Sequence, residues 1–138
     1  MELYISFTIP QNNSKIYIKM KPNNSKEQKI YQPVDRIKEE ILKTLNEKGI
    51  RIKRIILFGS RARGEATKLS DYDFLIITEK TFPIREKMRI AKAVRKALSE
   101  FLIPSDVIIN SEEEVEIKKN RIGCITRYAI EEGIVIYD

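Results

Sequence analysis

The chain of 138 residues contains no histidine and no tryptophan, and its one cysteine is Cys124. The absence of histidine excludes a Ser-His-Asp or Cys-His nucleophile and any histidine general base, unless a partner chain supplies one. A single cysteine cannot form a disulfide within the chain or build a multi-cysteine zinc or iron–sulfur site, and it favours a reducing compartment. The chemistry open to this chain therefore uses carboxylates, hydroxyls, lysine, arginine and a bound metal.

Long apolar stretches are also missing. No segment approaches the roughly 20 apolar residues that cross a bilayer. The first residues, Met-Glu-Leu-Tyr, lack the basic and apolar regions of a signal peptide. We therefore expect a cytoplasmic protein with no membrane partner. Its length, with 42% hydrophobic residues, suits the core of one ordinary domain.

Charge, in contrast, is plentiful. The chain has 26 Lys and Arg residues against 20 Asp and Glu, which gives a net charge of +6. A basic surface attracts anions and suggests a nucleotide, a nucleic acid or an acidic protein as partner. A solvated lysine-rich surface explains the charge equally well, so charge alone does not choose a partner.

The first 31 residues differ from the rest of the chain. Residues 3–9 and 15–20 alternate in side-chain character around a turn-forming Gln-Asn-Asn-Ser, which predicts a β-hairpin. A Pro-Asn-Asn-Ser stretch from Pro22 indicates a linker. We therefore predict a hairpin and linker over residues 1–31 and one domain over residues 32–138. The hairpin is expected to add an edge to the sheet of that domain, with dimerisation or partner binding as its alternative role.

Helical and strand patterns alternate along the remaining chain. Apolar residues at helical spacing, or in short continuous runs, mark each element. The predicted elements are a helix from Pro33 to Gly49, a strand at 55–58, a polar loop at 61–70, a strand at 72–77, a helix at 84–101, a strand at 106–109, a helix opening at Ser111, a helix from about Arg121 to Gly133 and a strand at 134–137. This order predicts an α/β (or α+β) domain with a small mixed β-sheet flanked by helices.

The long helix predicted at 84–101 has an apolar and a basic face. Its expected buried face consists of Ile84, Met88, Ala91, Leu98 and Phe101. We expect the opposite, basic face to be solvated. On the last predicted helix, Tyr128 is expected to be a packing or surface residue with no part in a site.

Segment 57–75 is the most informative about chemistry. Its apolar strand leads into Gly59 and Ser60, where a glycine lets the backbone approach a ligand closely and a helix start directs N–H groups and a hydroxyl at an anion. Gly59 and Gly64 have the spacing of a P-loop, but a glutamate and an alanine stand where Lys and Ser or Thr are required. The pattern indicates a different phosphate-binding turn, although an ordinary tight turn explains these residues when they are taken alone.

Three aspartates accompany this turn. On a strand, Asp71 and Asp73 point to one face, roughly 7 Å apart at the backbone, so both can bind one divalent cation or bracket two. Asp106 opens a separate short strand, and neighbouring strands about 4.8 Å apart can bring it to the same end of the sheet. Three carboxylates suit the two magnesium ions of a phosphoryl-transfer site. A turn residue and exposed strand ends are the alternative explanation.

Together these residues resemble a known signature. The sequence Phe-Gly-Ser-Arg-Ala-Arg-Gly at 58–64, after an apolar strand, and Asp-Tyr-Asp at 71–73 are similar to the minimal nucleotidyltransferases (MNT) of the DNA polymerase β superfamily. The resemblance extends over about residues 33–138. It implies a nucleotidyltransferase fold and the transfer of a nucleoside monophosphate from a nucleoside triphosphate, with pyrophosphate leaving.

The resemblance also implies a role for each matching residue. Gly59 and Ser60 would hold the β- and γ-phosphates of ATP or another nucleoside triphosphate. Arg61 and Arg63 would neutralise the triphosphate, with solvated loop arginines as the alternative.

For the acids, the resemblance implies metal binding. Asp71 and Asp73 would bind both ions, Mg²⁺ or else Mn²⁺. Asp106 would complete the metal ligands and act as the base toward the acceptor.

Minimal members of this family often occur beside HEPN-domain proteins as toxin–antitoxin pairs, with the transferase as antitoxin. The resemblance therefore implies transfer of AMP from ATP to a protein acceptor, a HEPN-type toxin. The alternatives are a binding antitoxin without catalysis and transfer to a small hydroxylated molecule or to RNA. A homo-oligomer and a nucleic-acid partner both stay open.

Overall fold

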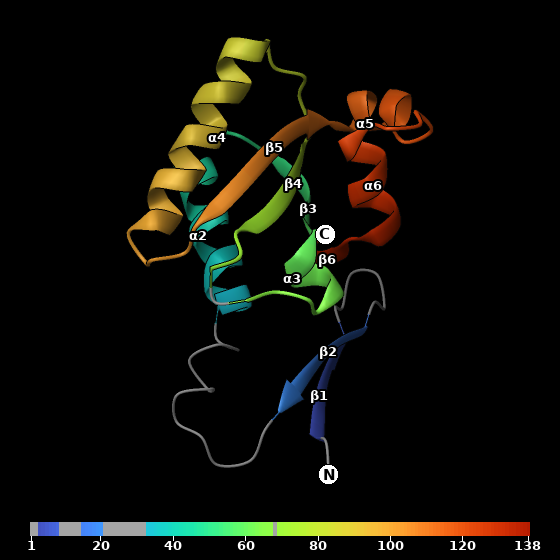
Figure 1. The fold of residues 1–138 in the computed structure, drawn as a ribbon. Helices are drawn as coiled ribbons and strands as arrows, with labels where there is room; N and C mark the ends of the chain where they lie inside the picture. Colours follow the sequence, from blue (N-terminus) through green and yellow to red (C-terminus); the bar gives the residue numbers. More distant parts are fainter. Residues whose placement is uncertain (1–2, 9–14, 21–32, 68) are drawn as a thin grey trace.

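A β-hairpin forms the N-terminal part of the protein. The computed structural model describes residues 3–8, 15–20, 33–67 and 69–138. Strand β1 (Leu3–Thr8) pairs antiparallel with β2 (Lys15–Met20), which confirms the predicted hairpin (Figure 1). The two strands form a sheet of their own. The expectation that they add an edge to the main sheet is therefore wrong, because neither β1 nor β2 pairs with any of the four strands of that sheet.

The main sheet has four strands in the order β5-β4-β3-β6. Strand β3 is antiparallel to both β4 and β6, whereas β4 and β5 are parallel. The strands are β3 (Ile52–Phe58), β4 (Tyr72–Thr78), β5 (Ser105–Ser111) and β6 (Ile134–Tyr137). Helix α4 (Ile84–Ser99) connects the parallel pair, which needs a crossover of this kind. The sheet is therefore mixed, as the sequence predicts.

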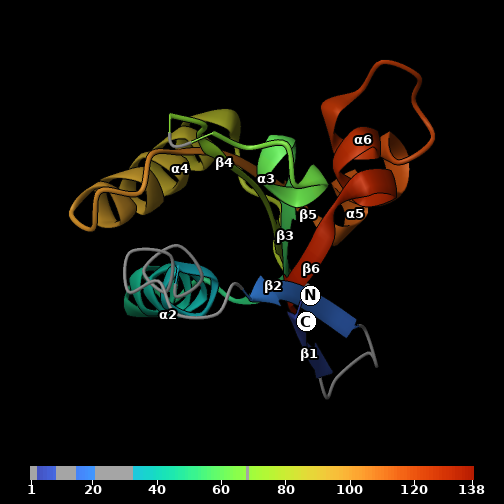
Figure 2. The same cartoon turned by 60° about the horizontal axis from the view of Figure 1, so that its bottom comes forward.

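Helices cover both faces of this sheet. Figure 2 shows α2 (Pro33–Glu47) and α4 on one face, and α5 (Glu112–Lys118) and α6 (Ile125–Glu132) on the other. The short helix α3 (Ser60–Arg63) lies at one end of the sheet. This confirms the α/β prediction. Within the described residues, none of these helices combines the length and the apolarity needed to span a membrane.

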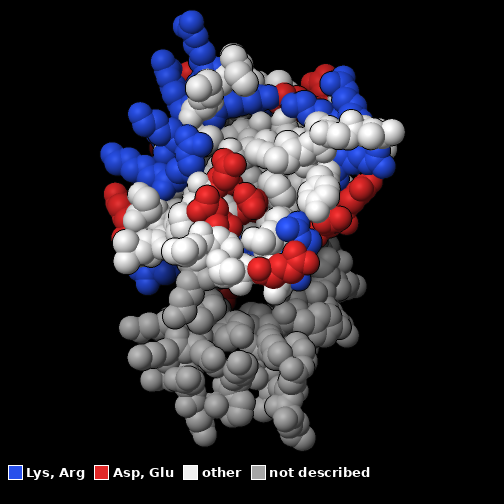
Figure 3. Space-filling model, viewed as in Figure 1, with Lys and Arg blue, Asp and Glu red and all other residues white. Residues whose placement is uncertain are grey.

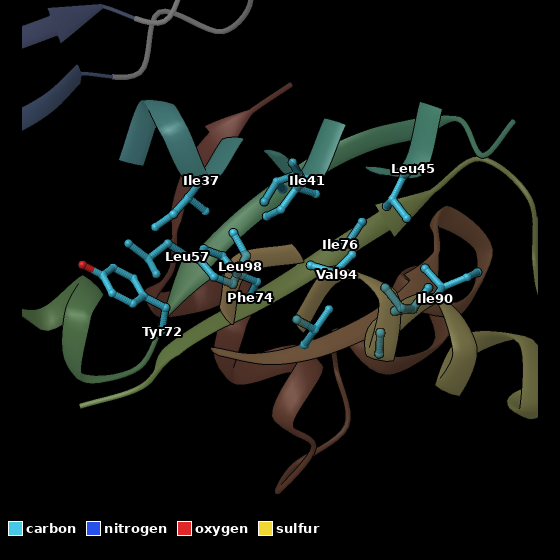
Figure 4. Packing of buried hydrophobic residues seen from close by; sticks show 14 of the residues in the cluster. Ile37, Ile41, Leu45, Leu57, Tyr72, Phe74, Ile76, Ile90, Val94 and Leu98 are labelled. Atoms are coloured by element: carbon cyan, nitrogen blue, oxygen red, sulfur yellow. The ribbon is translucent and has the colours of Figure 1, made fainter. Parts of the chain in front are cut away.

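Alternate residues of the central strands enter two cores, which explains their continuous apolar sequences. On one side, Phe74 and Ile76 of β4 lie in the same cluster as Ile41 of α2 and Val94 of α4 (Figure 4). The smaller cluster on the other side consists of Ile56, Phe58, Leu75, Ile77, Val115 and Ala129. Asp73 has the same strand parity as Leu75, so its side chain lies on the side opposite Phe74.

Helix α6 begins later than the sequence predicts. Its first residue is Ile125 rather than a residue near Arg121, and Cys124 is its N-cap. Gly123 has a φ of 79°, which no right-handed helix contains. The glycine therefore ends the preceding turn and delays the helix.

The buried face of α4 also differs from the prediction. Ile84 and Met88 are 71% and 65% exposed, although both were expected in the core. The buried residues of the helix are Ile90, Ala91, Val94 and Leu98. Because α4 packs over β5, an edge strand, the part of the helix beyond that edge has no strand beneath it among the described residues.

Candidate active site

Three strand ends meet at one end of the main sheet. Strand β3 runs antiparallel to β4, which is parallel to β5, so the carboxyl end of β3 lies beside the amino ends of the other two (Figure 1). Phe58, the last residue of β3, lies opposite Asp73 of β4, and Asp73 lies opposite Asp106 of β5. The turn after β3 and two of the three aspartates are therefore neighbours, as the sequence predicts.

The backbone at Gly59 suits glycine alone. Its φ of 74° and ψ of −157° belong to a region that strains any residue with a side chain. A Cβ atom at this position would also collide with Oδ2 of Asp73. Glycine therefore allows the Asp73 carboxylate to lie directly against the backbone of the turn.

Helix α3 starts immediately after this glycine. The N–H groups of Ala62 and Arg63 both donate to the Gly59 carbonyl oxygen at 3.1 Å. The N–H groups of Ser60 and Arg61 come before them in the first turn, where no helical carbonyl is available. These two N–H groups and the Ser60 hydroxyl are therefore available to donate hydrogen bonds to phosphate oxygens.

Asp73 lies in an electrostatically unfavourable position. Burial, followed by repulsion from Asp106 and Asp71, raises the pKa of its carboxyl above the usual value, while Arg63 acts in the opposite direction. Asp71 and Asp106 are exposed, and Asp73 is half-buried. Figure 3 shows acidic side chains gathered in the middle of this face. The three carboxylates therefore lie near enough to repel one another.

These carboxylates do not by themselves form a compact metal cage. Among the residues that the structure describes, no three acidic, cysteine or histidine side chains lie close enough to hold one ion. Their chemistry nevertheless fits a divalent cation, because Mg²⁺ takes carboxylate oxygens as ligands and a positive charge relieves the repulsion at Asp73. Metal binding by Asp71, Asp73 and Asp106 stays a prediction.

Arg61 lies across the loop between α3 and β4. Its Nε and Nη2 donate to the carbonyl oxygen of Ser70 at 3.3 and 2.9 Å. Its guanidinium lies 4.3 Å from the centre of the Tyr72 ring, a cation–π distance. These contacts hold the loop against the start of β4, whereas contact of Arg61 with a triphosphate stays a prediction.

Arg63 has a partner that the sequence analysis missed. Its Nη1 donates to the Tyr128 hydroxyl at 3.2 Å, and its Nε donates to Oε2 of Glu65 at 3.0 Å. Arg63 is also near enough to Asp73 to affect the pKa of that carboxyl. Tyr128 lies in α6, 65 residues from Arg63, so no local pattern could have connected the two. Tyr128 thus contacts a candidate site residue, and its 42% exposure agrees with the expectation of a surface residue.

A buried hydrogen bond fixes the start of α6 on the sheet. Nδ2 of Asn110, in β5, donates to Oγ1 of Thr126 at 2.8 Å, and both residues are almost inaccessible to solvent. Nζ of Lys118 donates to Oδ1 of Asn110 at 3.0 Å, so the buried amide is bonded at both ends. Because Thr126 lies in the same helix as Tyr128, this network helps to set where the Tyr128 hydroxyl meets Arg63.

Comparison with known proteins identifies a family that agrees with the sequence resemblance. A family model described as "Nucleotidyltransferase domain" matches residues 38–129. Two proteins of Methanocaldococcus jannaschii, each named "Putative protein adenylyltransferase", are similar in sequence. One is 38% identical over 87 residues, which are 63% of this chain and 80% of that protein. The other is 32% identical over 103 residues, which are 74% of this chain and 97% of that protein.

Solved structures that the comparison matched include two toxin–antitoxin complexes. One is described as a toxin-antitoxin with AMP-PNP; it has a TM-score of 0.49 and 20% identity, over 72% of this chain and 71% of that chain. The other is a tri-AMPylated Shewanella oneidensis HEPN toxin in complex with MNT antitoxin. It has a TM-score of 0.48 and 17% identity, over 75% of this chain and 71% of that chain.

Proposed function

The chain belongs to the nucleotidyltransferase domain family, and on that premise we propose that it transfers AMP from ATP to a hydroxyl group of a protein acceptor. The observation that carries the proposal is the register that sets Asp73 beside both the Gly59 turn and Asp106. The names of the two M. jannaschii relatives favour a protein as acceptor. Because ATP is an intracellular substrate, we assign this activity to the cytoplasm.

The turn after β3 is the proposed triphosphate site. At Gly59 no side chain stands between a phosphate and the backbone, and the first N–H groups of α3, with the Ser60 hydroxyl, donate to phosphate oxygens. Arg63 adds a positive charge beside this turn, held by Tyr128 and Glu65. A positioned guanidinium loses less conformational entropy when a phosphate binds than a freely rotating one does.

The proposed reaction is an in-line displacement at the α-phosphorus of ATP. A bond forms between the acceptor oxygen and this phosphorus, and the bond from the phosphorus to the bridging oxygen of the β-phosphate breaks. Pyrophosphate leaves with the electron pair of that bond. The hydroxyl proton moves to a carboxylate oxygen of Asp106, the residue that the family resemblance assigns as base.

The residues that would hold Mg²⁺, or Mn²⁺ in its place, are Asp71, Asp73 and Asp106. When bound, such an ion neutralises phosphate charge and favours the deprotonated acceptor oxygen. The chain itself contributes three carboxylates, which place negative charge where the cation would bind. The raised pKa of Asp73 reflects the burial and the repulsion that accompany this arrangement without a metal.

We propose a HEPN-type toxin as the specific acceptor, with the present chain as its antitoxin. This follows the family resemblance carried by residues 58–64 and 71–73. In this role the chain would inactivate its partner by adding AMP to it. The nucleotide and the partner protein would then both be bound at the face that carries the acids.

The test is labelling of acceptors in a lysate of the source organism with purified protein, magnesium and ATP that carries ³²P on either the α- or the γ-phosphate. We expect a protein band labelled from the α-phosphate alone, because adenylylation retains that phosphorus and releases the other two. The band should be absent with the Asp71→Ala, Asp73→Ala variant. A control variant, Glu47→Ala, Glu100→Ala, changes two exposed acids outside the site and should label normally.

Each other outcome has a definite meaning. Labelling of the same band from the γ-phosphate, where it requires the wild-type protein, would show phosphorylation and overturn the proposal. Labelled RNA or a labelled small molecule would replace the protein acceptor. No labelling by a protein that still binds ATP would favour an antitoxin that acts by binding alone. Normal labelling by the Asp71→Ala, Asp73→Ala variant would refute the site.

A further inference from the structure

A groove follows the outer edge of β5, which pairs with no strand among the described residues. It has a volume of about 490 Å³ and lies between α4 and the end of α5. Its floor is formed by residues 107–110 of the edge strand, and one wall is formed by α4 from Ile84 to Arg95. Lys118 of α5 lines the opposite side. The groove thus passes around the sheet edge from one helical layer to the other.

The strand at the floor of this groove presents unused peptide groups. The N–H of Tyr72 donates to the carbonyl oxygen of Pro104 at 2.9 Å, which in a parallel ladder directs alternate residues of β5, from Asp106, toward β4. Val107 and Ile109 therefore direct their peptide groups outward. The N–H of Val107 is taken by Oδ1 of Asp106 at 3.1 Å. The carbonyl of Val107 and both peptide groups of Ile109 face away from β4, and no described strand pairs with this edge, although Ile109 as a whole is 4% exposed.

The walls of the groove are basic and partly apolar. Its basic lining residues are Lys87, Arg89, Lys92, Arg95 and Lys118, and no acidic residue lines it within the described chain. Lys87 is paired with Glu114, and Arg89 with Glu86. Lys92 and Arg95 are exposed and have no ion pair among the described residues. Figure 3 shows the blue side chains that project over α4 on this side of the molecule.

Ile84 and Met88 are the exposed apolar residues of the groove. Both line the groove and are 71% and 65% exposed, which is unusual for large apolar residues of a helix that packs on a sheet. They lie beside the two unpaired cations. An occupant therefore needs negative charges, apolar side chains and backbone groups that can pair with a strand.

We propose that this groove binds an extended, acidic segment of a partner protein, which adds a strand to the outer edge of β5. A peptide satisfies the outward peptide groups of Ile109, its acidic side chains pair with Lys92 and Arg95, and its apolar side chains cover Ile84 and Met88. A nucleic acid has no peptide groups for the strand edge, and no aromatic side chain lines the groove for base stacking. A protein segment fits every feature, whereas a nucleic acid fits the charge alone.

The groove begins next to the candidate active site. Asp106 lies in β5 immediately before the strand residues at the floor of the groove. A segment bound along β5 would therefore run past this carboxylate. Under the proposed function, the groove would hold the acceptor protein while its hydroxyl reaches the acids. Peptide binding can be measured without transfer, so failure of one proposal is distinguishable from failure of the other.

The test uses the full chain and a fluorophore-labelled peptide of alternating glutamate and valine, followed by fluorescence anisotropy. We expect saturable binding that weakens about tenfold or more in the Lys92→Glu, Arg95→Glu variant, because two attractive contacts become repulsive. The matched control is Arg85→Glu, Lys96→Glu, which makes the same charge change on the same helix outside the groove. It should bind within about twofold of the wild type, since it loses long-range attraction alone.

Two further probes separate strand pairing from simple charge attraction. A fully N-methylated form of the same peptide keeps its charges but cannot donate N–H groups to β5, so its binding should be lost. The NMR amide signal of Ile109 should shift with the unmethylated peptide. Circular dichroism should show the folded spectrum for each variant.

Several results would overturn the proposal. These are no saturable binding of the peptide, equal binding of its N-methylated form, equal weakening by the control variant, or an Ile109 amide that does not respond. A lysine and valine peptide that binds as well as the acidic one would also refute it. Tighter binding of oligouridylate through Lys92 and Arg95 would identify a nucleic-acid surface in place of a peptide groove.

Discussion

At the scale of single residues, Gly59 and Asp73 are in close contact, and the position of each limits which residue the other can be. The carboxylate occupies the space that any side chain at position 59 would need. The Gly59 backbone, with its φ of 74°, in turn sets where α3 begins. The candidate site therefore requires both the carboxylates and the lack of a Cβ atom at position 59.

We predict that Gly59→Ala reduces transfer by about 100-fold, because the new methyl group displaces the Asp73 carboxylate and errors of about 1 Å in a site have effects of this size. It should also destabilise the fold by about 1–3 kcal/mol, because a φ of 74° with a ψ of −157° strains any residue other than glycine. Gly64→Ala is the control, since Gly64 has a φ of 73° but nothing within 4 Å of an added Cβ. Transfer rates and urea unfolding of both variants test this, and equal rates would contradict the displacement.

The raised pKa of Asp73 predicts how stability depends on pH. The folded state favours the protonated carboxyl, so the contribution of Asp73 to the stability of the metal-free protein should fall as pH rises from near 3.8 through the raised pKa, whereas Glu114, whose pKa is lowered, contributes in the opposite direction. Asp73→Asn should remove this loss. Asp106→Asn should reduce it and should stabilise the metal-free protein by up to about 1 kcal/mol, because a like-charged neighbour is removed.

Thermal unfolding between about pH 4 and pH 7 in EDTA measures this dependence, in a range that covers carboxyl titration. Glu47→Gln, at an exposed acid in the last turn of α2, should keep the wild-type dependence. An unchanged pH dependence in Asp73→Asn would show that this carboxyl is not responsible.

Sequence reasoning predicted that Gly59, Asp73 and Asp106 would lie near one another, since strand parity and a glycine turn can be read from short segments. The register of β3, β4 and β5 brings these residues together, whereas their roles stay predictions. Tyr128 was missed because it reaches Arg63 from a distant helix. The contacts of Arg61 with the neighbouring loop also depend on how that loop folds back, which no periodicity encodes.

At the scale of elements, the end of α4 contains a strained residue. Leu102 has a φ of 58° and is the only residue other than glycine with positive φ in the described part of the chain. Its N–H donates to Ser99 and that of Ile103 donates to Leu98, which closes the helix end. Leu102 is 90% exposed, so its side chain contributes almost nothing to the core.

Leu102→Gly is therefore predicted to stabilise the protein by about 0.5–1 kcal/mol. Relief of left-handed strain exceeds the extra entropy that glycine gives the unfolded chain. The matched change Leu69→Gly removes an equally exposed leucine without positive φ and should destabilise instead. Urea unfolding measures both variants. Destabilisation by Leu102→Gly would show that this backbone carries no strain.

Helices and strands were predicted well where short-range pattern decides them. Predictions that depend on where the main sheet ends were less accurate. The helix predicted to open at Ser111 is present as α5, and Ser111 caps it by accepting a hydrogen bond from the Glu114 N–H at 3.1 Å. Apolar spacing placed Ile84 and Met88 in the core, but periodicity cannot show that the sheet ends beneath them. The hairpin was found by its alternation, whereas its separation from the main sheet depends on tertiary structure.

At the scale of the whole molecule, the main sheet and its helices come from Pro33 onward. All described residues of the two core clusters belong to this part. We predict that a chain of residues 33–138 folds and binds ATP within about threefold of the full chain, a difference of about 0.6 kcal/mol. Circular dichroism and ATP titration test the division of the chain at residues 31 and 32.

A shorter chain of residues 52–138 is the control for this truncation. It also lacks α2, whose Ile37, Ile41 and Leu45 are at most 1% exposed. Loss of even one such core side chain costs about 2–5 kcal/mol, so this chain should not fold. If the chain of residues 33–138 is unfolded as well, the hairpin segment is part of the domain and the division is wrong.

The contact between Gly59 and Asp73 has an evolutionary consequence. While the carboxylate is present, any other residue at position 59 is penalised twice, by backbone strain and by collision. Once a descendant has lost the aspartate, only the backbone penalty remains, so substitution at position 59 becomes less costly, although a φ of 74° and ψ of −157° still favour glycine. Among descendants of this chain, the residue at position 59 would then record whether selection still maintains catalysis.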